Sequence, residues 1–226
     1  MARTGADIER EKRIAAERSA QLVQAGMRVG LGTGSTVAFL LPAIAQRDLN
    51  LRCVTTSPAT ERQARDLGLR VEPFEGTESL DRLDIAIDGA DQVDASGWLV
   101  KGGGAAHTRE KRVAAAADRF VVIVDSGKLV DRVRAPVPVE LLDFGLAATL
   151  RDLGTVTLRD VPRSPDGGVI ADFEGDVVDA GQLAARLDAA PGLVAHGLFP
   201  PSMVSEVVIG RGEEAELRRV AAGPAG

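Results

Sequence analysis

Short apolar segments alternate with helical segments over the first 125 residues, and this alternation limits the possible folds more than any other feature. Four runs have the length and composition of buried strands: 27–31, 51–55, 83–88 and 120–125. The helices predicted around and between them are 8–25, 37–48, 58–68 and 108–117. Strands that alternate with helices at this spacing predict βαβ units and a mostly parallel sheet, hence an α/β fold.

The pattern changes after Val133. Two prolines follow closely in RAPVPVELLD, and then come strand-like segments and a helical segment at 179–190. This texture predicts a second, smaller α+β lobe over 132–204. The run SEVVIG at 205–210 predicts a strand that returns to the main sheet. We therefore expect a core of 1–131 plus 205–226, with disorder in the last residues of the polar tail.

Composition excludes several classes of protein. Hydrophobic residues make up 45% of the 226 residues and charged residues 27%, which is typical of a globular chain. The net charge is -6 with no basic run, so nucleic acid is not an expected partner. Cys53 is the only cysteine, which excludes an intramolecular disulfide. With no signal-peptide pattern and no apolar run of about 18 residues, a cytoplasmic protein without a membrane partner is expected.

Polar loops follow each of the four predicted strands. They are GTGST (32–36), TTSPAT (55–60), DGAD (88–91) and DSGK (125–128). In open α/β sheets, ligands bind beyond the carboxyl ends of the strands. The four loops therefore predict one binding edge.

The loop GTGST favours an anion site over a dinucleotide site. From Gly30 the glycines run G-x-G-x-G, which is not the dinucleotide fingerprint, and no Gly-Lys-Ser/Thr of a P-loop occurs there. A loop of glycines and hydroxyls that opens a helix offers free N–H groups to a phosphate. A tight turn capped by Ser35 or Thr36 is the alternative.

The segment from Asp88 to Lys111 combines acids, a lysine next to three glycines, and Glu110. Each has an ordinary explanation alone, because Asp and Gly form turns and acids are common in the first turn of a helix. Together they indicate acid–base chemistry on a small polar molecule. His107 has two readings, a packing role or a place near this site. The chain has only two histidines, and they are too far apart in the sequence to indicate a metal site.

The chain resembles the type A ribose-5-phosphate isomerase family over nearly its whole length. The motifs that carry the resemblance are GLGTGST, TTSPAT, DGADQVD, KGGGAAHTREK, VDSGK, PVPVE and PGLVAHGLF. The resemblance implies a cofactor-free enzyme that interconverts D-ribose 5-phosphate and D-ribulose 5-phosphate in the non-oxidative pentose phosphate pathway. It also implies a Rossmann-like core, a smaller ferredoxin-like lobe, and a homodimer or homotetramer.

The resemblance also assigns roles to residues. Glu110 resembles the family's catalytic base, with Lys101, Asp88 and Asp91 as further catalytic residues. The implied substrate-binding residues are Thr33, Gly34, Ser35, Thr36, Asp88, Gly89, Ala90, Asp91, Lys101, Gly102, Gly103, Gly104 and Lys128. Lys12 is a weaker candidate for a phosphate contact.

Three other functions are compatible with parts of the pattern. A sugar-phosphate sensor is disfavoured because the chain has no helix-turn-helix segment and no basic face. A coenzyme A transferase would use a glutamate as nucleophile, which an acyl-CoA requirement and a covalent adduct on Glu110 would reveal. An isomerase of another phosphosugar, such as an amino sugar phosphate, is opposed only by the identity of the motifs.

Overall fold

The computed structural model describes residues 3–220 of the chain. Contacts between Cα atoms separate these residues into two compact units. The core unit runs up to Gly89, continues through Arg109–Lys128 and resumes at Pro201. The lobe comprises Ala90–Thr108 and Leu129–Pro200. Residues 90–108, which the sequence-based boundaries place in the core, are thus grouped with the lobe.

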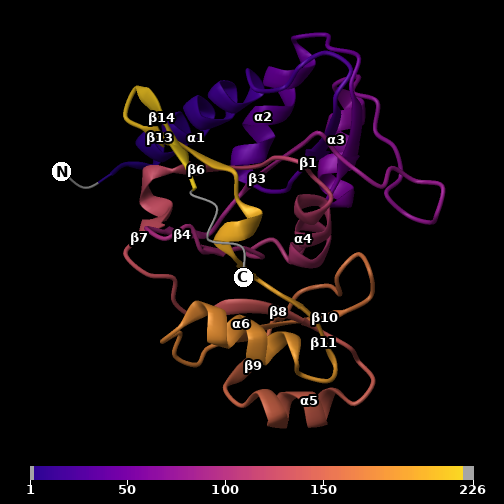
Figure 1. Ribbon diagram of the computed structural model, residues 1–226, viewed down its shortest axis with the longest axis vertical. Coiled ribbons are helices and arrows are strands. Elements are labelled where there is room, and N and C mark those ends of the chain that lie inside the picture. Colours follow the sequence, from indigo (N-terminus) through magenta and orange to yellow (C-terminus); the bar gives the residue numbers. More distant parts are fainter. Residues whose placement is uncertain (1–2, 221–226) are drawn as a thin grey trace. The chain divides into compact units, whose positions relative to one another are not determined.

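A six-stranded sheet forms the centre of the core unit (Figure 1). In spatial order its strands are β14 (Glu214–Arg219), β13 (Glu206–Arg211), β6 (Phe120–Asp125), β3 (Ile85–Gly89), β1 (Arg28–Leu31) and β2 (Arg52–Thr55). All neighbouring pairs are parallel except β13 with β14. The predicted α/β fold with a mostly parallel sheet is confirmed, and the run at 205–210 does return to this sheet.

Helices α1 (Gly5–Ala20) and α2 (Ser35–Ala45) pack against each other on this sheet (Figure 1). Val29 and Leu31 of β1 share a buried cluster with residues of both helices. Gly30 points the other way, because side chains alternate along a strand. A Cβ on Gly30 would lie 2.4 Å from Cγ1 of Val113 in α4 (His107–Ala115), so only glycine lets this helix approach β1 closely. Helix α3 (Pro58–Asp66) follows β2.

The first helix was predicted at 8–25, and these bounds are wrong. The helix begins at Gly5 because Thr4 and Asp7 form a capping box, in which each side chain bonds the other's backbone N–H. It ends at Ala20, and Gly26, at φ +78°, turns the chain into β1.

The polar tail also differs from expectation, because Glu214–Arg219 forms β14. This strand pairs with β13 across a turn at Gly212, where φ is +61°. The expected disorder of the last residues concerns 221–226, which lie outside the described residues.

The lobe contains two four-stranded sheets. The first, entirely antiparallel, is ordered β11 (Leu193–His196), β8 (Val137–Leu141), β10 (Val169–Phe173), β9 (Val156–Leu158). Helices α5 (Leu146–Leu153) and α6 (Ala180–Asp188) contribute to its apolar core. The second consists of β12 (Leu198–Phe199), β5 (Leu99–Val100), β4 (Gln92–Asp94) and β7 (Leu129–Val130). The predicted small α+β unit is therefore present.

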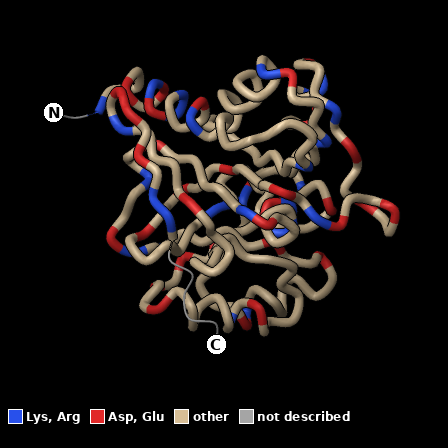
Figure 2. Tube along the Cα trace, turned by 45° about the horizontal axis from the view of Figure 1, so that its top comes forward, with Lys and Arg blue, Asp and Glu red and all other residues tan. Residues whose placement is uncertain are grey.

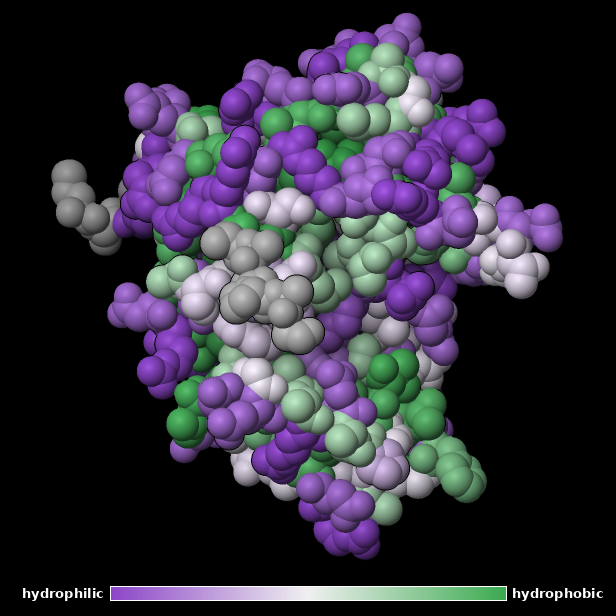
Figure 3. All heavy atoms as spheres, in the orientation of Figure 1, coloured by the Kyte–Doolittle hydropathy of each residue, from purple (hydrophilic) through white to green (hydrophobic). Residues whose placement is uncertain are grey.

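The surface carries both charge signs. Figure 2 shows acidic and basic residues interspersed along the trace. Hydrophilic residues cover most of the face drawn in Figure 3, with smaller hydrophobic areas between them. Among the described residues, no helix has the length and apolar character needed to cross a membrane.

Candidate active site

The structure divides the predicted site residues between the two units. The core unit holds Thr33, Gly34, Ser35, Thr36, Asp88, Gly89, Glu110 and Lys128. The lobe holds Ala90, Asp91, Lys101, Gly102, Gly103 and Gly104. Each group is described by itself.

The loop after β1 leads directly into α2. Gly34, at φ +115°, is the N-cap residue of α2. Within the described chain, no side chain makes a capping hydrogen bond to the start of this helix. Ser35 is the first helical residue, so the alternative of a turn capped by Ser35 or Thr36 is not found. The first N–H groups of a helix lack partners within the helix and carry its positive dipole end, which suits an anion. Gly34 and Ser35 are exposed, so an anion can reach them.

Thr33 links the loops that follow three neighbouring strands. Its Oγ1 lies 2.8 Å from Oγ1 of Thr56, after β2, and 3.2 Å from Oγ1 of Thr60. Its backbone N–H donates to Oδ1 of Asp88 on β3 at 3.0 Å. These contacts confirm, within the core unit, that the carboxyl ends of β1, β2 and β3 form one polar edge.

Asp88 is held in place by backbone groups. Its Oδ1 also accepts the N–H of Gly89 at 2.7 Å, and the side chain is 3% exposed. Gly32 must be glycine here, because a Cβ at that position would lie 1.9 Å from Oδ1 of Asp88. Glu110, on the first turn of α4, is buried as well, at 5% exposure. Buried carboxylates are rare without a structural or chemical duty.

The turn after β6 carries Lys128 and is anchored by α1. This turn is the 3-10 helix Ser126–Lys128. Glu11 of α1 accepts the N–H and the Oγ–H of Ser126 at 3.0 and 2.8 Å, and the N–H of Gly212 at 3.0 Å. Arg3 donates to Glu11 and to Asp125, both at 2.6 Å.

These contacts change the pKa of Glu11. Burial alone would raise its pKa, since burial penalises the charged form. The donors from Gly212 and Ser126, with the charge of Arg3, outweigh burial and lower the pKa below its ordinary value. Glu11 is therefore an ionised carboxylate that ties the Lys128 turn to the first helix.

In the lobe, Lys101 precedes the three glycines and is 2% exposed. Its Nζ lies 5.5 Å from the ring centroid of Phe199, a cation–π distance. Its backbone N–H donates to the carbonyl of Gly197 at 2.8 Å. Lysine is seldom buried, so the burial of Lys101 is unusual.

The glycine loop that follows has backbone conformations that favour glycine. Gly102 has φ +104°, and a Cβ there would lie 2.7 Å from Nδ1 of His107 and 2.9 Å from Cβ of Pro138. Gly103 donates its N–H to Oδ2 of Asp91 at 2.8 Å. Ala105 is left-handed at φ +59°, and its N–H closes a turn onto the carbonyl of Gly102. The buried imidazole of His107 lies against this loop, which agrees with both readings, packing and a place near the predicted site.

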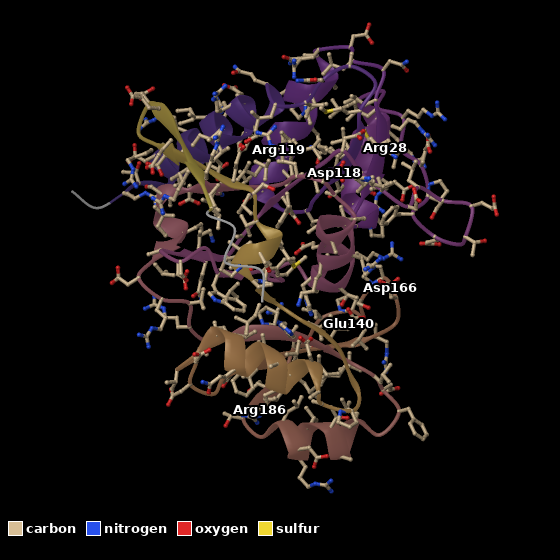
Figure 4. All side chains as sticks on the ribbon, viewed as in Figure 1. Arg28, Asp118, Arg119, Glu140, Asp166 and Arg186 are labelled. Atoms are coloured by element: carbon tan, nitrogen blue, oxygen red, sulfur yellow. The ribbon has the colours of Figure 1, made fainter. Side chains whose placement is uncertain are left out.

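Two supporting clusters in the lobe were not identified from the sequence. Arg159 contacts the carbonyls of Gly102 and Gly103. Glu140 on β8, labelled in Figure 4, accepts hydrogen bonds from Thr108 and Ser164. Glu140 ends the PVPVE motif, which was quoted for the resemblance without a role for its glutamate, and Arg159 lies in no quoted motif, so only the fold reveals these contacts.

Comparison with known proteins identifies the family. The family model of ribose 5-phosphate isomerase A (phosphoriboisomerase A) matches residues 52–214. The chain belongs to this family. The family predicted from the motifs is therefore confirmed, and with it an isomerase.

Relatives in the ribose 5-phosphate isomerase A family match most of the chain. The isomerase A of Halobacterium salinarum is 42% identical over 230 residues, covering 96% of this chain and 99% of its own length. That of Rhodopseudomonas palustris is 43% identical, covering 90% and 94%.

Solved isomerase A structures have the same fold. The structure from Methanocaldococcus jannaschii has a TM-score of 0.84 at 31% identity, covering 92% of this chain and 97% of that one. A D-ribose-5-phosphate isomerase in complex with phospho-erythronic acid has a TM-score of 0.86 at 29% identity, covering 94% and 99%.

Other polar groups considered from the sequence have these surroundings. Lys12 pairs with Glu9 at 2.7 Å along α1. Burial raises the pKa of the Cys53 thiol to about 12, which removes it as a nucleophile at neutral pH. Leu198 donates its N–H to Nδ1 of His196, so Nε2 carries the proton toward Asp188. Over residues 3–220 there is no group of three or more His, Cys, Asp or Glu that could hold a metal ion.

Proposed function

We propose that the protein interconverts D-ribose 5-phosphate and D-ribulose 5-phosphate in the non-oxidative pentose phosphate pathway. The observation that carries the proposal is the match to relatives named ribose-5-phosphate isomerase A over 96% of the chain. A related structure with bound phospho-erythronic acid supports a phosphosugar ligand. The residues that the motifs single out for this reaction are all present.

The reaction moves one proton between two carbons. In the open-chain aldose, the carboxylate of Glu110 takes the proton from C2, and the electrons of that bond form an enediolate. Glu110 then returns the proton to C1, while a proton moves from O2 to O1, which gives the ketose. A single positioned base therefore serves both half-reactions, and base catalysis of this kind contributes about 10²–10⁴-fold.

The enediolate oxygen needs positive groups or strong donors. Lys101 supplies a buried cation, and the N–H groups of the glycine loop supply dipoles. Asp88 and Asp91 accept hydrogen bonds from backbone N–H groups, which fixes these carboxylates to orient sugar hydroxyls. We assign the orienting role to these two acids.

The phosphate is assigned to the loop 33–36 with Lys128. The uncapped start of α2 and the hydroxyls of Ser35 and Thr36 supply donors and a positive dipole end. Lys128 adds a cation from a turn that Glu11 holds in place. Binding the phosphate far from the reacting carbons positions C1 and C2 for proton transfer.

The test is to incubate the purified protein with ribose 5-phosphate in EDTA and follow ribulose 5-phosphate by NMR. We expect turnover with no added metal or cofactor. Ribose without the phosphate should react far more slowly, and glucosamine 6-phosphate should not react. No ribulose 5-phosphate, or faster turnover of the amino sugar phosphate, would refute the proposal.

We also propose a cytoplasmic homodimer or homotetramer, as the family resemblance implies. Sedimentation velocity of the purified protein measures the mass directly. A monomer at micromolar concentration would contradict the assembly without affecting the proposed reaction.

A further inference from the structure

Arg159 reaches the glycine loop from another part of the lobe. Its Nη1 donates to the carbonyl of Gly102 at 2.9 Å and to the carbonyl of Gly103 at 3.3 Å. Its Nε and Nη2 donate to the two carboxylate oxygens of Asp172 at 2.7 and 2.6 Å. One guanidinium thus bridges the carboxylate of Asp172 and two consecutive loop carbonyls.

The sheet fixes the direction of this side chain. Arg159 continues β9, and its N–H donates to the carbonyl of Ile170 on β10 at 3.0 Å. Thr157 lies opposite Asp172 in the register, and Arg159 shares the face of Thr157 because side chains alternate along a strand. Asp172 is thus the diagonal neighbour of Arg159 across the two strands. Two parallel hydrogen bonds join the guanidinium to this carboxylate, so the guanidinium has little rotational freedom.

All three nitrogens of Arg159 therefore have protein acceptors, and the side chain is only 18% exposed. An arginine that recognises a substrate phosphate presents two of its N–H groups in a fork to the ligand. Here the fork is used by Asp172. This arrangement favours a role in shaping the protein over direct contact with a ligand.

Because the peptide group is planar, a contact that fixes the direction of a carbonyl also fixes the direction of the next residue's N–H. In a planar trans peptide, the carbonyl of one residue and the N–H of the next point in opposite directions. Holding the carbonyl of Gly102 aims the N–H of Gly103, which donates to Asp91 on the other side. Holding the carbonyl of Gly103 aims the N–H of Gly104 in the same way.

The loop needs this support because its own sequence gives it little stiffness. Glycine has the largest backbone freedom, and both Gly103 and Gly104 are exposed. The turn from Gly102 to Ala105 is closed by one backbone hydrogen bond of 3.0 Å. Without an external anchor, the N–H groups would sample several directions.

We propose that Arg159, anchored by Asp172, is a positioning residue that fixes the glycine loop, so that the N–H of Gly104 is aimed at the substrate oxygen while the N–H of Gly103 stays on Asp91. The catalytic part of this inference rests on the proposed isomerase function. Its structural part, the fixed direction of the loop N–H groups, does not. The two parts are therefore tested by different measurements.

The first measurement compares kcat and KM for Arg159→Ala, Arg159→Lys and the wild type. We expect kcat of Arg159→Ala to fall about 10- to 100-fold with KM changed less than about threefold, because misplaced catalytic groups lower the rate more than affinity. Arg159→Lys should stay at least about fivefold below the wild type, since an ammonium cannot reproduce the planar fork. Full rescue by lysine would show that charge alone matters, and would overturn the proposal.

Arg163 provides a matched control in the same lobe. It also pairs with an aspartate, Asp143 at 2.9 Å, and donates to a glycine carbonyl, that of Gly167 at 3.3 Å. Its side chain is 50% exposed, and its glycine is not in the site motif. Arg163→Ala should leave kcat and KM unchanged, and an equal loss in both alanine variants would refute a specific role for Arg159.

The second measurement is amide hydrogen exchange at Gly103, whose N–H is bonded to Asp91, and it needs no turnover. Exchange at this amide should accelerate at least about tenfold in Arg159→Ala and stay unchanged in Arg163→Ala. If Arg159→Ala fails to fold, Asp172→Asn replaces it, with the same acceleration expected because the anchor is weakened. Unchanged exchange refutes the positioning role, whereas a wild type that exchanges as expected but does not isomerise refutes only the proposed function.

Discussion

The core unit and the lobe support their predicted site residues in different ways. In the core, the GTGST loop follows β1 and Asp88 lies near the end of β3, and the parallel pairing of these strands places both at one edge. In the lobe, Gly102–Gly104 form a loop outside any helix or strand. That loop is held by side chains, with Asp91 on the N–H of Gly103 and Arg159 on two carbonyls.

The difference shows where each half is vulnerable. A sheet edge is supported by many cooperative backbone hydrogen bonds, so single side-chain changes alter it little. A loop with exposed glycines depends on a few polar contacts. When one of these contacts is lost, the loop backbone can adopt more conformations, and the fixed loop becomes less populated. We therefore expect substitutions in the core to lower activity mainly where they remove a reacting group. In the lobe, substitutions of residues that support the loop should lower activity as well.

The largest expected effect separates the chemistry of the two units. Glu110→Gln in the core keeps the shape of the side chain but removes the base, so kcat should fall by about 10²–10⁴-fold with KM little changed. Lys101→Met in the lobe keeps the buried chain but removes the cation, and kcat should fall by about 10²-fold. Steady-state kinetics with ribose 5-phosphate measures both.

The kinetic constant that each of these two variants changes tests the assignment of roles. If Glu110→Gln retains the wild-type kcat, Glu110 is not the base. If Lys101→Met raises KM alone, Lys101 binds the phosphate instead of stabilising the enediolate. A thermal melt of each variant serves as the control, because a change in kcat is interpretable only when the fold is intact.

The polar edge of the core sheet could be predicted from the sequence. Buried apolar runs ending in polar loops indicate parallel strands, and the carboxyl ends of such strands meet at one edge. This physical rule joined Thr33, Asp88 and the turn at Lys128 without any knowledge of contacts. Helix ends and the edge strand β14 were missed, because caps and edge pairing depend on a few polar residues with weak periodicity.

The supporting residues could not be predicted. Arg159 lies more than fifty positions from the glycines that it contacts, and Glu11 lies more than a hundred positions from Ser126. A lone arginine or glutamate in a sequence has an exposed, solvated position as its ordinary explanation. Only tertiary folding brings each to its partner.

A second prediction compares one glycine in each unit. Gly32→Ala forces its Cβ against Oδ1 of Asp88, 1.9 Å away, so the carboxylate must move. Alanine at position 102 would have to adopt the φ of +104° that Gly102 has now, which is strained for any residue with a side chain. Its Cβ would also clash with His107. Each should lower kcat about 10- to 100-fold, and overpacking should lower the free energy of unfolding by about 1–3 kcal/mol.

Gly76→Ala is the control for backbone strain alone. Gly76 has φ +74°, and nothing lies within 4 Å of a Cβ built there. This variant should lose about 1 kcal/mol of stability through the left-handed conformation and keep its kcat. If Gly102→Ala behaves like Gly76→Ala, with normal turnover, the shape of the lobe loop is not required for catalysis.

The smallest expected effect concerns a core turn that a distant side chain holds, the turn at Lys128. Glu11 has a pKa below its ordinary value of 4.5, because its hydrogen bonds and Arg3 outweigh burial. Its stabilising contribution is therefore complete above about pH 4.5 and is lost as the pH falls toward the lowered pKa. The free energy of unfolding should fall more steeply between about pH 5 and pH 3 in the wild type than in Glu11→Gln.

At neutral pH, Glu11→Gln should cost about 2 kcal/mol, within the range for hydrogen bonds to a charged group. Glu72→Gln is the matched control, because Glu72 also accepts from an arginine, Arg52, at 2.7 and 2.9 Å, but on the solvated surface. Its loss should be clearly smaller than that of Glu11→Gln, since water screens exposed pairs. Equal losses in the two variants would show that the Lys128 turn does not depend on Glu11.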